Sequence, residues 1–450
     1  MTQTTTIDAP ITILGRSLPR MMVVAASSWI SRLTTAAISL VSIGILIQLL
    51  GVEHYAIYAV LISISGWFSL VDLGVGESLQ NFISESRARG FTSAGHQGAA
   101  YLIVLLAAIL MLGLLYGFGQ WPASVLLQEF VVLSDQQKFN YFFLICSLAT
   151  LSATGAIIYK VWFAEQRGYL SNILPAVASA LGLGGVLTLN LMQASDPLFW
   201  ALIAINTPLF LLPLLALLRR FGKIFSQART DLWKHSRQIL NRGMSFWLFH
   251  ASVLVVLHVD YVILARFVDP DQIVVYNIVS KIFLIVSVFY SAVLQAFWPV
   301  AAEALVHHDW TGIRKFLNLY FRYGVSLVIL FSLAFFLFKD ILVGILSPDR
   351  PIMIDDTLIA LFCLMYLIRM WTDVFAVILQ SMNDMKIILL WASIQGLVGL
   401  VLQLSFVPLW GIYGTVISLC LSWIMTVGWV LPRRVKERQH HHEAVACKGH

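Results

Sequence analysis

The sequence predicts an all-α integral membrane protein with about twelve transmembrane helices in two six-helix lobes. Three observations support this fold class. Of the 450 residues, 59% are hydrophobic and only 12% are charged, which is more apolar surface than a soluble core of this length buries. Long apolar runs fill almost the whole chain, and basic residues collect in alternate gaps between them. The bilayer is therefore the expected solvent.

A helix that crosses a bilayer needs about 20 apolar residues. Runs of this kind are predicted as spans at 22–50, 55–76, 98–118, 140–164, 170–192, 197–218, 243–267, 273–300, 317–346, 355–380, 386–408 and 410–432.

Basic residues recur in every second gap, while the opposite gaps lean acidic. The basic gaps contain Arg87 and Arg89; Lys160 and Arg167; Arg219, Arg220, Lys223, Arg229, Lys234 and Arg237; Arg314 and Lys315; Lys386; and the tail Arg433, Arg434, Lys436 and Arg438. The positive-inside rule then predicts an inner (plasma) membrane protein with both termini cytoplasmic. The net charge of +6 is a topology signal under this interpretation, and no nucleic acid partner is expected.

The longest basic gap divides the chain into halves of similar length. The predicted organisation is a cytoplasmic N-terminal segment over 1–21, an N-terminal lobe over 22–218, a basic cytoplasmic linker over 219–242, a C-terminal lobe over 243–432 and a cytoplasmic tail over 433–450. A faint echo between the halves supports duplication. Glu53 precedes Tyr58 as Asp271 precedes Tyr276, and a glutamate follows about 27 residues later in each half, at Glu85 and Glu303.

Few ionisable residues fall inside the predicted spans of the first half. A charge in mid-span costs at least about 2.5 to 3.5 kcal/mol, so such a side chain faces protein or water. Arg32 lies on a helical stripe of serine and threonine in the first span. Asp72 and Gln80 lie on a similar stripe in and after the second. Because a dry helix interface has no room for an arginine, these stripes favour a hydrated cavity.

The second half carries a second polar group, with Asp260, Asn277 and Lys281 in the seventh and eighth spans. Lys281 follows Asn277 by one helical turn and can pair with Asp260 across helices. A purely structural buried pair is an alternative of similar weight. In the tenth span, Arg369 and Asp373 are four residues apart and can neutralise each other within one helix.

A cationic cavity suits an anionic cargo, because moving a phosphate group through hydrocarbon costs tens of kcal/mol. Arg32, Lys281 and Arg369, with the amides of Gln80 and Asn277, are the candidate substrate-binding residues. The carboxylates are the candidate sites for a coupling proton or sodium ion: Asp72, Asp260 and Asp373. The sequence does not decide between these roles. It also leaves open whether the transport is driven by an ion gradient or by the electrochemical potential of the substrate.

No metal site, cofactor or catalytic residue is predicted. The four cysteines show no CxxC spacing, three adjacent histidines at the tail are the nearest approach to a metal motif, and no Walker A loop occurs. A membrane enzyme such as a glycan polymerase, ligase or glycosyltransferase is the alternative of another class. Such enzymes need a large outer loop or an acidic pair near the membrane face. The adjacent residues Asp355 and Asp356 come closest to such a pair, but a solvated loop explains them better.

The stretch from Leu50 to Gly90 resembles the first helical hairpin of the polysaccharide transporter (Wzx-like) branch of the multidrug/oligosaccharidyl-lipid/polysaccharide exporter superfamily. The resemblance rests on a Leu-Gly before an aromatic-rich turn, then on Asp72, Leu73, Gly74 and Gly76. Further agreement comes from the following positions: Asp260, Tyr276, Lys281 and Pro299; the 380–384 turn before Lys386; and Gly411, Ile412, Tyr413 and Gly414. His54 and Tyr55 in the outer turn depart from many relatives.

This resemblance implies two six-helix lobes around a central cavity that opens alternately to the two sides of the membrane. It implies a flippase that carries an undecaprenyl-pyrophosphate-linked oligosaccharide repeat unit outward, for O-antigen, capsule or exopolysaccharide synthesis. Membrane lipids, a polysaccharide polymerase and a chain-length regulator are the implied partners. A multidrug exporter of the same superfamily remains an alternative. The major facilitator class is a poorer match, because residues 85–90 lack its usual signature.

Overall fold

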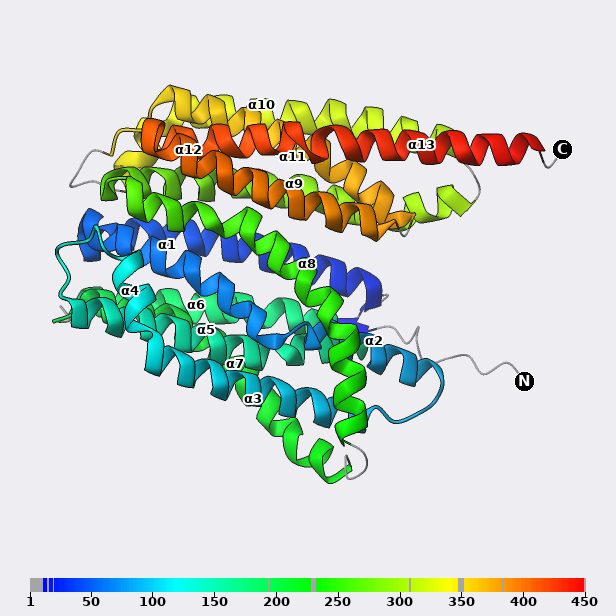
Figure 1. Ribbon diagram of the computed structural model, residues 1–450, viewed down its shortest axis with the longest axis horizontal. Helices are drawn as coiled ribbons and strands as arrows, with labels where there is room; N and C mark the ends of the chain where they lie inside the picture. Colours follow the sequence, from blue (N-terminus) through cyan, green and yellow to red (C-terminus); the bar gives the residue numbers. More distant parts are fainter. Residues whose placement is uncertain are drawn as a thin grey trace. The chain divides into compact units, whose positions relative to one another are not determined.

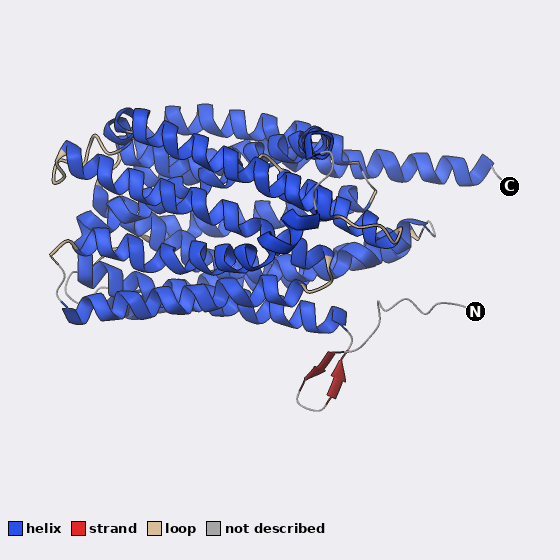
Figure 2. Ribbon diagram, turned by 90° about the horizontal axis from the view of Figure 1, so that it is seen from below, coloured by secondary structure: helices blue, strands red, loops and turns tan. Residues whose placement is uncertain are grey.

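The computed structural model describes residues 11–13, 16–18, 20–192, 195–227, 232–306, 309–346, 352–382 and 384–448, and these residues are almost entirely helical (Figure 2). By their internal contacts they form two units. Unit 1 contains Met1–Leu50 and Leu61–Ala251, and unit 2 contains Gly51–Val60 and Ser252–His450.

The helices follow one another with short connections (Figure 1). Up to the middle of the chain they are α1 (Arg20–Ser65), the 3₁₀ helix η2 (Gly66–Asp72), α2 (Val75–Ala88), α3 (Ala94–Phe118), α4 (Gln120–Leu126), α5 (Asp135–Ala164), α6 (Gly168–Met192) and α7 (Pro197–Gln227). They continue as α8 (Leu232–Phe267), α9 (Pro270–Val306), α10 (Trp310–Leu346), α11 (Asp356–Ser381), α12 (Met385–Met425) and α13 (Val427–Lys448).

Two short strands are the exception to the predicted all-α fold. β1 (Ile11–Ile13) and β2 (Arg16–Leu18) pair antiparallel, with Ile11 opposite Leu18 (Figure 2). The alternation of β-branched and polar residues in Ile-Thr-Ile suits a strand. The polar composition of the segment before the first span gave no indication of this hairpin.

Nine helices within the described ranges are long and apolar enough to span a membrane. Two of the nine are interrupted by a glycine with positive φ, Gly51 (72°) and Gly411 (54°), at the boundary between two runs predicted as separate spans. The run at 243–267 lies in α8, which is not among the nine. The protein is a multi-pass membrane protein, while the count of twelve spans and the orientation of the termini stay predictions.

One helix in each unit packs against most of its neighbours. In unit 1, α5 contacts η2, α2, α3, α4, α6 and α7. In unit 2, α11 contacts α9, α10, α12 and α13. Small residues permit the closest approaches: a Cβ on Gly155 of α5 would lie 2.8 Å from the backbone nitrogen of Leu214 in α7. Without a hydrophobic force between helices in lipid, such close backbone packing is the main source of association.

Each unit satisfies a backbone carbonyl that a proline has left without its helical partner. Pro213 in α7 has no N–H for the carbonyl of Leu209, and the Ser152 hydroxyl of α5 donates to that oxygen at 3.3 Å. Pro432 in α13 likewise has no N–H to donate to the carbonyl of Gly428. There the indole Nε1 of Trp371, from α11, donates to the freed oxygen at 3.0 Å.

These two arrangements are related by a constant shift of 219 residues, since 152 corresponds to 371, 209 to 428 and 213 to 432. The same shift relates Glu165 and Asp384, at the turns that follow α5 and α11. Arg220 of α7 binds Glu165 through two hydrogen bonds of 2.7 and 2.9 Å. Arg434 and Arg438 of α13 bind Asp384 at 3.1 and 2.8 Å. The two units therefore repeat one set of inter-helix contacts.

The contacts at Asp384 also act on its ionisation. Burial raises the pKa of this carboxyl group, but the hydrogen bonds from Arg438 and Arg434 outweigh burial and hold the pKa below its usual range. Asp384 is therefore ionised at neutral pH, and its contacts join the turn after α11 to the first half of α13.

Removing the Ser152 hydroxyl tests the proline arrangement. Ser152→Ala is expected to destabilise the protein by about 1–3 kcal/mol, because the Leu209 carbonyl loses its donor in an apolar setting. Adding Pro213→Ala restores a backbone N–H for that carbonyl and should recover at least half of the loss. Thermal unfolding in detergent measures both. Ser147 of the same helix, whose hydroxyl has no partner among the described residues, provides the control Ser147→Ala. Equal destabilisation by the two serine variants contradicts this account.

Candidate functional site

A helix in unit 1 is broken at two consecutive left-handed residues. η2 ends at Asp72, Leu73 and Gly74 have φ of 53° and 69°, and α2 begins at Val75. The Asp72 carboxylate accepts a hydrogen bond from the Gly74 backbone nitrogen at 2.9 Å. Discontinuous helices expose backbone groups and ionisable side chains inside transporters, and they commonly form ion and substrate sites.

The break is held against α8 by backbone contacts. A Cβ on Gly74 would lie 2.2 Å from the carbonyl oxygen of Gly243. One turn later on α8, the indole nitrogen of Trp247 donates to the Leu70 carbonyl at 2.9 Å. Only glycine fits at position 74, because both the positive φ and the close approach exclude a side chain.

Charged groups of both signs gather beside this break, in a group that we call the unit 1 cluster: Asp72, Glu77, Lys160 and His250. The Lys160 ammonium lies 2.7 Å from the Glu77 carboxylate, and His250 Nε2 lies 3.8 Å from the same oxygen. A Cβ placed on Gly76 would be 3.2 Å from an Asp72 oxygen and 3.1 Å from Cγ of Lys160.

Two opposing effects act on Glu77. Burial raises the pKa of the Glu77 carboxyl group, but the neighbouring Lys160 ammonium outweighs burial and places the pKa below its ordinary value. Glu77 is therefore an anion at neutral pH that offsets the charge of Lys160. The sequence predicted Asp72 here but assigned Lys160 to a basic cytoplasmic gap and did not single out Glu77. The only available signal was a lysine at the end of an apolar run.

Arg32 and Gln80 belong to other parts of unit 1. Arg32 is exposed on α1. Next to it, the Ser31 hydroxyl donates to the backbone carbonyl of Asn172 on α6, whose side-chain amide donates to Ser27 at 3.0 Å. Gln80 is half-buried on α2, one turn beyond Gly76. The polar stripe on α1 thus combines a helix contact with an exposed arginine.

In unit 2, two of the predicted residues are fully engaged with tyrosines. Asp260 is 7% exposed and accepts hydrogen bonds from the Tyr276 hydroxyl at 2.5 Å and the Tyr261 backbone nitrogen at 2.9 Å. The Asn277 amide donates to the Tyr261 hydroxyl at 2.7 Å and accepts from that of Tyr55 at 2.8 Å. These contacts join α8, α9 and the 51–60 segment of α1.

Lys281 is not paired with Asp260, although the sequence allowed that ion pair. Among the residues that the structure describes, no carboxylate lies within 4 Å of the Lys281 ammonium. Lys281 lies one turn beyond Asn277 on α9 and is half-buried. Tyr276, five residues before Lys281, supplies a hydroxyl to Asp260 instead. Lys281 is consequently a half-buried cation suited to an external anion.

Arg369 and Asp373 form the ion pair that their spacing on one helix allowed. Arg369 Nε lies 3.7 Å from Asp373 Oδ2, and the Tyr290 hydroxyl of α9 donates to the same oxygen at 3.2 Å. The guanidinium carbon of Arg369 is 5.9 Å from the centre of the Tyr366 ring. Within the described ranges, no group of three or more His, Cys, Asp or Glu side chains is arranged to hold a metal ion.

Comparison with protein families matches residues 24–305 to the family described as "Polysaccharide biosynthesis protein". A "Putative O-antigen transporter" of Salmonella typhi is 33% identical over 418 residues, which are 92% of this chain and 96% of that protein. A "Putative O-antigen export protein" of Yersinia pseudotuberculosis is 32% identical over 426 residues, which are 92% of this chain and 95% of that protein.

Solved structures of similar fold share little sequence with this chain. An inward-facing multidrug resistance MATE family transporter of the MOP superfamily superimposes with a TM-score of 0.69 at 15% identity, over 92% of this chain and 99% of the other. The lipid II flippase MurJ in an inward closed conformation superimposes with a TM-score of 0.66 at 13% identity, over 89% of this chain and 86% of the other. At these identities the likeness describes the fold alone.

Proposed function

We propose, from the premise that this chain belongs to the polysaccharide biosynthesis protein family, that it is a flippase for a lipid-linked oligosaccharide. The resemblance seen in the sequence is thereby confirmed at the level of the family, and the protein is a membrane transporter and not an enzyme. The proposed cargo is an undecaprenyl-pyrophosphate-linked repeat unit. It moves from the cytoplasmic to the periplasmic leaflet by alternating access between two lobes, with both termini cytoplasmic.

The similarity to O-antigen transporters along 92% of the chain carries this proposal, because it covers both units. Lys281 supports it chemically. A pyrophosphate headgroup cannot enter hydrocarbon unless fixed cations and water replace its hydration, and a half-buried ammonium without a described carboxylate nearby offers such a charge. A negative-inside potential also favours outward movement of an anion, by about 2.3 kcal/mol per charge per 100 mV.

We divide the eight predicted site residues into three groups. Asp260, Asn277, Arg369 and Asp373 are tied to partners inside unit 2, so we assign them a primarily structural role there. We retain Arg32, Gln80 and Lys281 as substrate contacts. Asp72 remains a candidate for ion coupling, now together with the other members of the unit 1 cluster. A polysaccharide polymerase and a chain-length regulator remain proposed partners.

The test is translocation of a fluorescent undecaprenyl-pyrophosphate oligosaccharide in proteoliposomes. Wild type is expected to move it, and Lys281→Ala or Arg32→Ala should slow movement at least tenfold. Arg89→Ala, at an exposed position of the turn after α2, is the matched control and should behave as wild type. Export of an organic cation without movement of any lipid-linked glycan would favour a multidrug exporter instead.

A further inference from the structure

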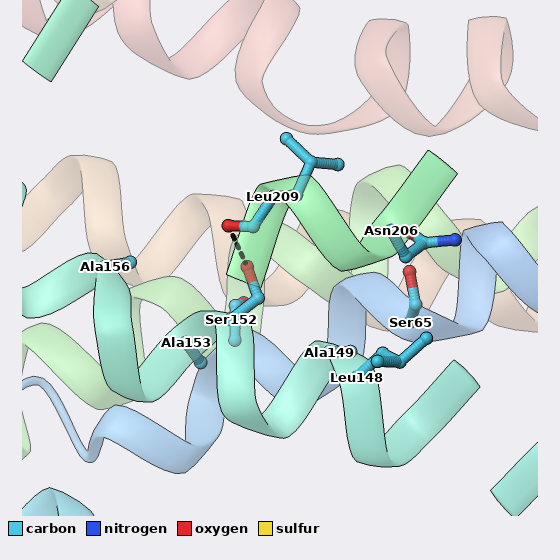
Figure 3. A pocket seen from close by; sticks show the side chains of 9 residues that line it. Ser65, Leu148, Ala149, Ser152, Ala153, Ala156, Asn206 and Leu209 are labelled. Atoms are coloured by element: carbon cyan, nitrogen blue, oxygen red, sulfur yellow. Dashed lines mark hydrogen bonds between the residues drawn. The ribbon is translucent and has the colours of Figure 1, made fainter. Parts of the chain in front are cut away.

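Unit 1 contains a pocket of about 260 Å³ between the end of α1, η2, α5 and α7 (Figure 3). Its lining combines the polar residues Ser65, Ser69, Ser152 and Asn206 with three alanines of α5 and two leucines. Ser69 at one edge is exposed, whereas Leu148 is buried. The pocket is therefore open on one side and closed on the other.

The three serines present acceptors to the pocket. Each hydroxyl donates its one hydrogen to a backbone carbonyl: Ser65 to Ile62 at 2.6 Å, Ser69 to Gly66 at 2.8 Å and Ser152 to Leu209 at 3.3 Å. A carbonyl cannot donate in return, so only the oxygen lone pairs of these serines remain free to bind a ligand. Asn206 donates one amide hydrogen to the Leu202 carbonyl at 2.8 Å, which leaves its amide oxygen as a fourth acceptor and its second amide hydrogen as a single donor.

A ligand that matches this lining brings hydroxyl donors and no negative charge. Among the residues that the structure describes, no ionisable side chain lines the pocket, so a phosphate would meet mainly acceptor oxygens and no cation. A hydrocarbon chain would leave the four acceptors without hydrogen bonds. A neutral sugar ring offers outward hydroxyl groups and an apolar C–H face, which suit the serines and the alanines of the lining respectively.

Unit 2 fills the equivalent position with aromatic side chains. The shift of 219 residues pairs Ser152 with Trp371 and Ala156 with Phe375. The rings of Trp371 and Phe375 lie 4.9 Å apart, and Phe321 stacks on Trp371 at 5.1 Å. The repeated helix frame thus accepts large side chains at these two positions, so the packing of α5 on α7 does not require Ser152 and Ala156 to be small, although it does require glycine at position 155.

We propose that this pocket receives one neutral sugar ring of the glycan, an inference that rests on the proposed function. The volume supports a single ring, because pockets for drug-sized ligands are larger, at roughly 300–1,000 Å³. Glycan recognition is then a property of unit 1, separate from the cation of Lys281 that serves the headgroup.

Cysteine protection tests occupancy directly. In a variant whose native cysteines are replaced by alanine, Ser69→Cys is reacted with a maleimide in nanodiscs. The native lipid-linked oligosaccharide is expected to slow labelling at least fivefold, while undecaprenyl pyrophosphate without sugar leaves it unchanged. Ser84→Cys, exposed on α2 and away from the pocket, should react with the maleimide at the same rate with either lipid and without one. Equal protection by the sugar-free lipid would assign the pocket to the lipid and overturn the proposal.

Filling the pocket with the side chains of unit 2 tests its role in transport. In Ser152→Trp/Ala156→Phe the new indole can donate to the Leu209 carbonyl, as Trp371 does to that of Gly428. Translocation of the lipid-linked glycan should fall at least tenfold. Leu110→Trp, on an exposed face of α3, should not affect it.

The outcomes separate the two proposals. If the wild type moves no lipid-linked glycan, the proposed function fails. If the wild type and the filled variant move it equally, only the sugar pocket is wrong. Should the filled variant fail to fold, absence of protection at Ser69→Cys by a glycan that the wild type carries would still refute the pocket.

Discussion

Replacing Gly74 by alanine is expected to destabilise the protein by about 3–5 kcal/mol, from two additive causes. The backbone there has φ of 69°, which an L side chain adopts at a cost of about 1–2 kcal/mol. The new Cβ would also lie 2.2 Å from the Gly243 carbonyl, so α8 must move away from the break after η2. Folded yield and the thermal unfolding temperature in detergent measure the loss.

Gly90 is the matched control, since its φ is 74° but a Cβ there would meet no atom of the described residues within 4 Å. Gly90→Ala should show only the backbone cost of about 1–2 kcal/mol. If both variants lose the same stability, the contact between Gly74 and Gly243 contributes nothing and the close approach of α8 is wrong.

Reversing the charge of Lys160 is the second large effect. Lys160→Glu places a carboxylate where an ammonium lies 2.7 Å from Glu77, near Asp72, and three acids would then share one site. We expect a loss of about 2–4 kcal/mol, below the 3–5 kcal/mol of a fully buried pair because Lys160 is 36% exposed. Translocation of the lipid-linked glycan should fall together with the stability. The proteoliposome assay measures it on the folded fraction of the protein.

The swap Glu77→Lys/Lys160→Glu restores opposite charges and should recover at least half of the lost stability. Arg433→Glu provides the comparison, because Arg433 is 83% exposed in its pair with Glu437 and should cost no more than about 1 kcal/mol. Recovery of stability without recovery of transport would show that the position of the ammonium matters for the cargo. No recovery of either would mean that the two side chains do not interact.

Ionisable residues inside apolar runs were predictable from the sequence, but their partners were only partly so. Arg369 and Asp373 lie four residues apart on one helix, so their pairing follows from helical geometry alone. Lys281 and Asp260 lie on different helices, and no spacing rule decides which side chain reaches across. Tyr276 reaches Asp260 instead. Glu77 and Lys160 were missed for the same reason, since 83 residues separate them and the pair exists only because α2 packs on α5.

The internal repeat shows the same limit. A weak similarity between the halves is visible in the sequence, but serine and tryptophan are so different that a sequence alignment would not match Ser152 with Trp371. They correspond because each donates a hydrogen bond to the carbonyl that a proline in the neighbouring helix has freed. Only the geometry identifies the two residues as equivalent, and only then does the difference between an open polar pocket and an aromatic filling become visible.

The sequence by itself determined that this protein lies in the bilayer as a set of long helices, because hydrocarbon admits only apolar segments whose backbone bonds are internal. It also identified the ionisable residues inside the apolar runs, Lys160 excepted, and its similarity to relatives determined the family. The tertiary structure decided which of those charges are neutralised inside a unit and where the chain breaks between η2 and α2 against α8. It alone placed a polar pocket in unit 1, because contacts between helices depend on packing that no local pattern encodes.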